Sequence, residues 1–405
     1  MTAEPSRGPL QGVRVVDFTA NMSGPFATMM LGDQGADVIK IESTNGGDTL
    51  RGLGPGVEDV STYFANLNRS KRSIALDLAN EESRPVVRAL LDQADVMIHN
   101  FRPSAAMKLG LDAAHVRAGR PSLIYLAIDG FGLNGPYGDR PAYDHVIQAL
   151  SGFADRQADP KSNVPGLVRQ GAIDKATGLT AAQAVTAALF ERTRTGVGQA
   201  IEVHMLDVAV SFLWPDGMMA HTMLDPSLGW QRPDIGKSFR LTKTRDGYLA
   251  YALAHARQWS RLAASVGLVS DDEDPQLTNE PPAQVEVLRA TGDKLATMNT
   301  VDAVEFISAM GIPVAEVVPL AEVFRHPQVM ASDVLDVIDH PQLGKIRQPN
   351  PPARFLNLRA GEMAPAPRLG QHADEVLREL GFSFDEVERL RDSGAVGISP
   401  LEGVE

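Results

Sequence analysis

The sequence predicts an α/β fold in which a doubly wound parallel sheet forms a large domain. In the first half of the chain, short aliphatic runs alternate with segments of helical periodicity. These runs are nearly continuously apolar, which is typical of strands that helices cover on both faces. The length of 405 residues, at about 150 residues per domain, predicts two or three domains.

The chain opens with a βαβ unit. Residues 13–18 form a β-branched run, a helical segment follows, and residues 37–42 form the next aliphatic run. Pro25 suits the first turn of the intervening helix, and Gly35 suits its C-terminal stop. A strand, a helix and a strand within about 30 residues predict parallel strands joined by a right-handed crossover.

The same alternation continues to about residue 224. Further strands are predicted at residues 73–78, 95–99, 123–128 and 199–205. Helices are predicted at residues 81–94, 143–152, 174–193 and 206–224. The third of these helices ends after two arginines and before Gly196, as helix C-termini commonly do.

Near Asp225 the composition changes and predicts a smaller α+β unit. A turn-rich segment precedes a hairpin around Asp246 and Gly247. Helices follow at residues 257–266, 283–295 and 301–310, and short strands and a final pair of helices return after residue 329. We therefore predict a large domain of residues 1–225 and 330–405, and a small domain of residues 226–329.

Composition excludes several classes of protein. The 38 basic and 51 acidic residues give a net charge of −13, so we expect neither a nucleic-acid nor a membrane partner. The absence of cysteine excludes disulfides, thiolate metal sites and a cysteine nucleophile. The chain start lacks an apolar signal region, and the most apolar helical stretch, residues 179–190, is too short to span a bilayer. We expect a soluble, cytoplasmic protein.

Several cofactor and catalytic motifs are missing. The turn after the first strand has one glycine where a dinucleotide fingerprint needs three, and no P-loop occurs. There is no HExxH pair and no G-x-S-x-G elbow. We expect no metal and no permanently bound cofactor, and His204 is predicted to be a packed core histidine.

Asp174 stands where the chain enters a strongly predicted helix. It suits an N-cap, because aspartate caps helices well and complements the positive end of the helix dipole. It equally suits a partly buried nucleophile that attacks an acyl group. Gly178, one turn further on, would let a bulky ligand approach the helix closely. Spacing alone leaves both roles for Asp174 open.

Two basic clusters could hold a phosphorylated ligand. Arg69, Lys71 and Arg72 precede a predicted strand, and they suit either an anion pocket or a solvated charge run. A second cluster follows the strand at residues 95–99, where ligands of open α/β sheets bind. Its members are Asn100, Phe101, Arg102 and Lys108. Phe101 offers a stacking face beside the cations.

Several segments in order resemble class III CoA-transferases, the CaiB/BaiF group. They are LQGVRVVDFT, LGDQGADVIKIE, NRSKRSIALDL, ADVMIHNFRP, ERTRTGVGQAIEVHMLD, GIPVAEVVPLAEVFRHPQV and LGQHADEVLRELG. The resemblance runs from about residue 10 to 385. It implies a Rossmann-like large domain, a small central domain and an interlocked homodimer.

The resemblance also implies the site and the chemistry. Asp174 matches the catalytic aspartate, which attacks an acyl-CoA thioester and then carries CoA to an acceptor acid. Coenzyme A and acyl-CoA are thus substrates rather than bound cofactors, and Tyr143 and Asp144 are expected near the acyl group. The residues implied to contact CoA are Leu76, Asn100, Phe101, Arg102 and Lys108, and Lys71 and Arg72 are expected to contact it as well.

The chain departs from its relatives at two positions. Ser43 stands where many relatives carry an arginine, for which Arg51, Lys71 or Arg72 would substitute. Met22 stands where formyl-CoA transferase has a glutamine. Arg169 and Arg240 could pair with a second carboxylate, which would make a dicarboxylate a suitable substrate.

Two other functions remain open. The resemblance extends to α-methylacyl-CoA racemase, whose pattern places a histidine where this chain has Tyr143. Tyrosine is a poor base near neutral pH, and His145 is expected to face elsewhere on its helix. A non-catalytic acyl-CoA-binding protein is the other alternative, and an aspartate in the expected place disfavours it.

Overall fold

The computed structural model describes residues 8–229, 235–270, 281–358 and 363–397. The chain divides into two compact units. Unit 1 comprises Met1–Pro215 and Val334–Glu405, and unit 2 comprises Asp216–Asp333. Both ends of the chain therefore belong to the larger unit.

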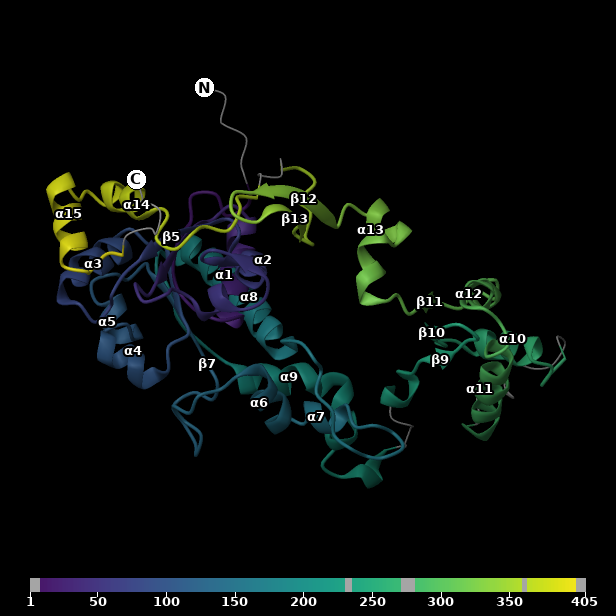
Figure 1. Cartoon of the computed structure of the whole chain (residues 1–405). Helices are drawn as coiled ribbons and strands as arrows, with labels where there is room; N and C mark the ends of the chain where they lie inside the picture. The colour runs from purple at the N-terminus through teal and green to yellow at the C-terminus, as the bar shows by residue number, and fades with distance from the viewer. Residues whose placement is uncertain (1–7, 230–234, 271–280, 359–362, 398–405) are drawn as a thin grey trace. The chain divides into compact units, whose positions relative to one another are not determined.

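A six-stranded parallel sheet is the centre of unit 1 (Figure 1). Its strands are β1 (Arg14–Phe18), β2 (Asp37–Glu42), β5 (Lys71–Ala75), β6 (Val96–His99), β7 (Ile124–Asp129) and β8 (Ala200–His204). The order across the sheet is β5-β2-β1-β6-β7-β8, which is the order of doubly wound nucleotide-binding folds. In this order the connections reverse direction beside β1, and ligands of such sheets bind at the carboxyl ends of the strands there.

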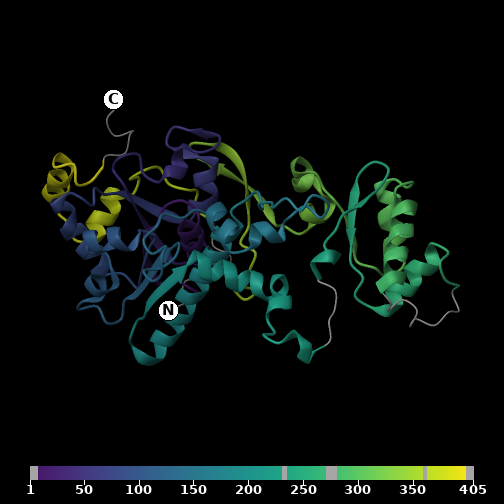
Figure 2. The same ribbon diagram turned by 90° about the horizontal axis from the view of Figure 1, so that it is seen from below.

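Helices cover both faces of this sheet. On one face, α3 (Arg84–Asp92), α5 (Ala113–Arg117), α14 (Ala373–Glu379) and α15 (Phe384–Asp392) share a buried core with the strands. The C-terminal helices lie beside α3 in both views (Figures 1 and 2). On the other face, α1 (Ser23–Asp33) packs against α8 (Ala172–Thr195). Coverage on both faces explains why the strands are aliphatic throughout.

The remaining elements of unit 1 are shorter. Its helices are α2 (Thr62–Asn68), α4 (Pro103–Leu109), α6 (Asp144–Leu150), α7 (Phe153–Arg156) and α9 (Met205–Gly217), with 3₁₀ turns η1 (Thr49–Gly52) and η2 (Glu81–Ser83). Two antiparallel pairs are β3 (Gly56–Val57) with β4 (Val60–Ser61), and β12 (Leu335–His340) with β13 (Gly344–Pro349). The helix predicted to reach residue 224 ends at Gly217, after Pro215, which removes a helical hydrogen bond.

Unit 2 has its own antiparallel sheet and core. The strand order is β11 (Val314–Glu316), β10 (Tyr248–Tyr251) and β9 (Thr242–Lys243). The helices α10 (Ala256–Ser265), α11 (Pro281–Leu295) and α12 (Thr300–Ser308) supply a buried cluster around Leu249 and Leu262. Shorter segments are η3 (Met219–His221), η4 (Pro226–Leu228), η5 (Ile235–Ser238), η7 (Leu320–Arg325) and α13 (Pro327–Ala331).

Candidate active site

Asp174 lies in the first turn of α8, at the end that faces the start of α1. The helix begins after Gly171, which provides no side-chain cap. The carboxyl of Asp174 is half-buried, and the Ser23 side chain, at the first position of α1, lies close enough to lower its pKa. The starts of two helices therefore meet at this one carboxylate.

Asp144 caps α8 in place of Asp174. Its buried carboxylate accepts hydrogen bonds from the backbone N–H groups of Ile173 at 2.7 Å and Asp174 at 2.9 Å. The second carboxylate oxygen accepts from the Gln148 amide. The interpretation of Asp174 as the cap is therefore wrong. Both oxygens of Asp144 are thus occupied by protein donors, and its expected place near the acyl group stays a prediction.

The electrostatic setting of Asp174 disfavours its charged form. Burial and the neighbouring negative charge of Asp144 raise the pKa of Asp174 to about 6, against smaller opposing effects from Ser23, His145 and Lys175. The ammonium of Lys175 donates to the side-chain oxygen of Gln170 at 2.9 Å. A carboxylate that is poorly solvated and weakly neutralised is a stronger nucleophile than one in a salt bridge.

Two glycines allow α1 and α8 to approach closely. A Cβ on Gly178 would lie 2.7 Å from the Ser23 carbonyl oxygen, and one on Gly171 would lie 2.4 Å from the Met22 sulfur. Gly178 thus makes room for the neighbouring helix, whereas the sequence predicts room for a ligand. This contact fixes the distance between Ser23 and the Asp174 carboxyl.

The sequence did not identify three residues around Asp174. They are Ser23 and Gln148, with the contacts given above, and Tyr63 in α2. Burial, followed by the charges of Asp174 and Asp144, raises the pKa of the Tyr63 hydroxyl, so this tyrosine lies within electrostatic range of both carboxyls. Tyrosine and serine hydroxyls carry no periodic signal, and only the fold brings these side chains to Asp174.

The turn after β6 holds part of the second predicted cluster. The Asn100 side-chain amide makes two hydrogen bonds to the backbone of Ala20. It donates to the Ala20 carbonyl oxygen at 2.6 Å and accepts from the Ala20 N–H at 2.9 Å. Asn100 therefore connects the turn after β6 to the turn between β1 and α1. Met22 and Ser23 come directly after this second turn in the sequence. Phe101 stacks on the His99 ring with centroids 5.5 Å apart, and its N–H donates to His99 Nδ1.

His99 itself is a neutral residue of the core. Burial lowers the pKa of His99 to about 4, and its Nε2 lies 2.6 Å from the Tyr125 hydroxyl. These contacts fix the orientation of the ring on which Phe101 stacks.

The basic members of this cluster lie on α4. Arg102 directly precedes the helix, and Lys108 is in its last turn, and both side chains are exposed. Lys108 lines a cavity of about 440 Å³ between α3, α4 and α5, together with Arg84, Arg88 and Arg120. The same cavity has apolar walls that include Leu78, Val87 and Leu109. Apolar walls with a basic rim suit a heteroaromatic ring that carries a phosphate.

The structure argues against three of the predicted CoA contacts. The ammonium of Lys71 is buried and donates to Asp17, Asn68 and the Pro25 carbonyl. Arg72 pairs with carboxylates of β2 and α14, namely Asp37, Glu375 and Glu379. Leu76 is 1% exposed within the core. The two cations are already neutralised, and the leucine has no surface left for a ligand.

The other residue suggested to replace the missing arginine is also engaged. Arg51 makes a buried, two-pronged ion pair with Glu42 and lies over the Phe64 ring. Arg69 pairs with Asp33 in the same buried manner. The interpretation of Arg69, Lys71 and Arg72 as a solvated charge run is therefore wrong, because the first two are buried.

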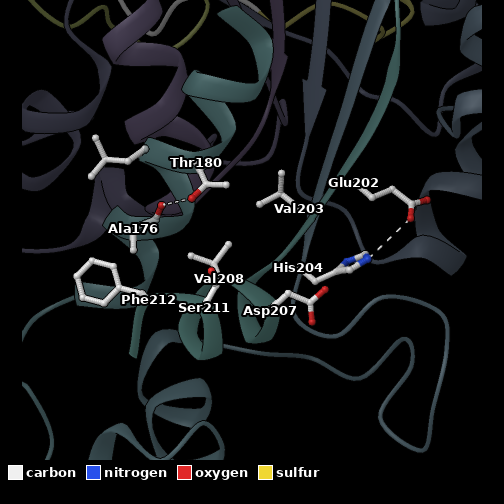
Figure 3. A pocket seen from close by; sticks show the side chains of 10 residues that line it. Ala176, Thr180, Glu202, Val203, His204, Asp207, Val208, Ser211 and Phe212 are labelled. Carbon is white, nitrogen blue, oxygen red and sulfur yellow. Dashed lines mark hydrogen bonds and ion pairs between the residues drawn. The ribbon is translucent and has the colours of Figure 1, made fainter. Parts of the chain in front are cut away.

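A second cavity, of about 430 Å³, lies between α8, β8 and α9 (Figure 3). Thr180, Glu202, His204, Asp207 and Ser211 supply its polar wall, and Leu179 and Phe212 are among its apolar residues. His204 is half-buried, with Nδ1 2.8 Å from Asp129, so it lines a cavity and is not a fully packed core histidine. None of the predicted site residues lines this cavity.

Metal clusters and membrane-spanning helices are both absent from the described ranges. Within them, no three His, Asp or Glu side chains are placed to hold a metal ion. None of the helices described there is both long and apolar enough to cross a membrane.

A doubly wound sheet with a poorly neutralised carboxyl at its ligand-binding edge is a framework in which that carboxyl can act as a nucleophile. The chain matches the CoA-transferase family III model over residues 10–373 and belongs to that family. It is thus a class III CoA-transferase, and the family resemblance found in the sequence is confirmed.

Named relatives and solved structures agree with this assignment. A succinate–glutarate CoA-transferase of Agrobacterium fabrum is 34% identical over 94% of this chain and 98% of its own length. A formyl-CoA:oxalate CoA-transferase of Afipia carboxidovorans is 31% identical over 97% of this chain and 98% of its own. The crystal structure of Rv3272 from M. tuberculosis matches with a TM-score of 0.77 at 31% identity, covering 92% of this chain and all of that one. A CaiB/BaiF family protein from Brucella suis gives 0.75 at 31% identity, covering 92% of this chain and 100% of that chain.

Proposed function

We propose that this protein moves CoA from an acyl-CoA donor to a carboxylic acid through a covalent intermediate on Asp174. The observation that carries the proposal is a half-buried carboxyl with a pKa of about 6 and no ion-pair partner in the described chain, at the sheet edge where such folds bind ligands. The printed names of the relatives include succinate, glutarate and oxalate, so the acids that we propose include dicarboxylates.

The first half-reaction begins when the Asp174 carboxylate attacks the thioester carbonyl. The C–S bond breaks, the electron pair leaves on CoA thiolate, and a mixed anhydride joins aspartate to the acyl group. The thiolate then attacks the aspartyl carbonyl, which forms an aspartyl-CoA thioester and releases the donor acid as a carboxylate. No external proton donor is needed, because thiolate and carboxylate both leave as anions.

The second half-reaction retraces these steps with the acceptor acid. Its carboxylate attacks the aspartyl thioester, thiolate leaves, and a new anhydride forms. Thiolate then attacks the acceptor carbonyl, which yields the acceptor's CoA thioester and restores Asp174. The Ser23 hydroxyl lies beside the carboxyl in the resting enzyme and lowers its pKa. The same hydroxyl is placed to stabilise negative charge on the aspartyl oxygen during each attack.

The CoA portion has support from α4 and its surroundings. The exposed cations Arg102 and Lys108 suit the phosphates, and the cavity beside Lys108 suits the adenine end. Phe101, held by His99, borders this route at the end of β6. Tyr143, which is 58% exposed, remains a proposed contact for the acyl group.

We also propose that two chains form an interlocked homodimer, as the family resemblance implies. Large apolar side chains on α8 and α9 support this, since Leu179, Phe190 and Phe212 are between 54% and 66% exposed. Light scattering during gel filtration tests the proposal, and a monomeric mass at micromolar concentration would contradict it.

Substitution of Asp174 by alanine tests the mechanism. We expect transfer to be lost while CoA binding, measured by calorimetry, is retained. Hydroxylamine added to the wild-type enzyme with acyl-CoA should convert Asp174 to its hydroxamate. Unchanged transfer by Asp174→Ala would refute the mechanism.

One observation favours a second activity, proton exchange next to the thioester. A positive charge on His145 lies close enough to Asp174 to lower the pKa of its carboxyl, although we expect the imidazole to face elsewhere on its helix. His145 is exposed and stacks parallel to Tyr143, with ring centroids 6.3 Å apart. Deuterium uptake from deuterated water, at the carbon next to the thioester and without an acceptor acid, would support this activity. Its absence, together with acid-dependent transfer, would leave CoA transfer alone.

A further inference from the structure

Arg169 is an uncommitted cation in the segment that leads into α8. Its side chain is exposed and makes no hydrogen bond or ion pair with any residue of the described ranges. The nearest cation along the chain on the other side of Asp174 is Lys175, which already donates to Gln170. Arg169 therefore supplies a free guanidinium five residues before the proposed nucleophile.

The backbone beside Arg169 is held in place by α6. The Gln148 side chain accepts from the N–H of Val168 at 2.9 Å and donates to its carbonyl at 3.1 Å. The same amide donates to Asp144, whose carboxylate holds the N–H of Asp174. One pair of α6 side chains thus fixes both the segment that carries Arg169 and the first turn that carries Asp174.

The negative charge around Asp174 means that an acid with two carboxylates needs a nearby cation in order to bind. Asp174 and Asp144 place two carboxyls at the site, and the protein carries a net charge of −13, so a dianionic acid is repelled. A guanidinium binds a carboxylate through two parallel hydrogen bonds, which offsets this repulsion and fixes the orientation of the acid. A monocarboxylic acid has no second charge to place and gains nothing from Arg169.

We propose that the acid substrate is a dicarboxylate and that Arg169 binds its distal carboxylate while the proximal carboxyl reacts at Asp174. The inference rests on the proposed CoA transfer and names its substrate class. Arg240, the other arginine considered from the sequence, belongs to unit 2, where its charge acts on the Tyr251 hydroxyl. Arg169 is the specificity-determining residue in this account.

The test compares succinyl-CoA with butyryl-CoA, which has the same chain length and lacks the second carboxylate. We expect Arg169→Met to lower kcat/KM for succinyl-CoA by roughly 10- to 100-fold, which corresponds to the loss of one charge-assisted pair of hydrogen bonds. The kcat/KM for butyryl-CoA should stay within about twofold of the wild-type value. Arg169→Lys should restore part of the loss. The matched control is Lys161→Met, an exposed cation earlier in the same loop, which should change neither substrate.

Other outcomes distinguish a failure of the dicarboxylate inference from a failure of the proposed CoA transfer. If the wild type uses both thioesters equally well, or if Arg169→Met slows both equally, the dicarboxylate inference is overturned and CoA transfer stands. If the wild type binds CoA but transfers it to none of succinate, glutarate, butyrate or valerate, the proposed function fails and the inference falls with it.

Discussion

Replacing Asp174 by asparagine should stabilise the fold while it abolishes transfer. Asparagine resembles the neutral carboxyl in shape and carries no charge. In the folded protein the carboxyl of Asp174 has a pKa of about 6 against an ordinary value of 3.8. The folded state therefore favours the protonated form, and its stability falls as the pH rises from below 3.8 to above 6.

The size of this effect follows from the same two values. The difference between about 6 and 3.8, at about 1.4 kcal/mol per pH unit, amounts to about 3 kcal/mol above pH 7. At pH 5, where the folded carboxyl is mostly protonated, the penalty is about half as large. Asp174→Asn removes the penalty, so the variant should gain about 3 kcal/mol at pH 8 and about half of that at pH 5.

Urea denaturation of both proteins at the two pH values measures this gain. The control is Asp207→Asn, an exposed aspartate in the first turn of α9, for which we expect a change below about 0.5 kcal/mol. If Asp174→Asn is no more stable than the wild type at pH 8, the carboxyl is not held in a penalised, ionised state. The electrostatic reasoning about the nucleophile would then be refuted.

Further predictions concern the pH profile, the helix cap, the CoA contact and the buried ion pair. The rate should fall as the pH drops through about 6, because protonation of Asp174 removes the nucleophile; a rate that stays flat down to pH 5 would contradict this. Asp144→Ala should cost about 2 kcal/mol in urea denaturation, because two backbone N–H groups of α8 lose their acceptor, whereas unchanged stability would show that the cap is dispensable. Lys108→Gln should raise the KM for acyl-CoA by about tenfold with little change in kcat, and a fall in kcat alone would place this lysine elsewhere in the reaction. Lys71→Met should lower the free energy of unfolding by about 3–5 kcal/mol, because it leaves the buried Asp17 charge without its lysine partner. The KM of the folded variant for acyl-CoA should stay unchanged. A raised KM would instead support the original prediction that Lys71 contacts CoA.

The parallel sheet was predictable because its signals are local. The β-branched runs at β1 and β2, and the helix with Pro25 in its first turn between them, each lie within a few consecutive residues. The antiparallel turn around Asp246 and Gly247 in unit 2 was predictable for the same reason. Element ends were less certain, as the early end of α9 at Gly217 illustrates.

The partners of charged side chains were not predictable from local sequence. Lys71 meets Asp17 from 54 residues away, and Arg72 meets Asp37 from 35 residues away. Asp37 lies in β2, the strand next to β5, and Asp17 lies in β1, one strand further on, so only the assembled sheet brings these carboxylates to the cations. The capping of α8 by Asp144, 30 residues before Asp174, is equally a product of the fold. The cations close together in sequence at residues 69–72 therefore predicted an anionic ligand, whereas in the structure they form ion pairs with the protein's own carboxylates.

The central claim is that an oxygen atom of the Asp174 carboxylate is transferred to the donor acid and is replaced by an oxygen atom of the acceptor acid. We would let the enzyme turn over with an acyl-CoA and an acceptor acid whose carboxylate carries ¹⁸O, and then map the peptides by mass spectrometry. Relay through the side chain predicts that the Asp174 peptide gains one ¹⁸O atom and that the donor acid acquires the label only from the second turnover onward. A labelled donor acid in the first turnover with an unlabelled Asp174 peptide would mean that the two acids react directly, and the covalent account would be wrong.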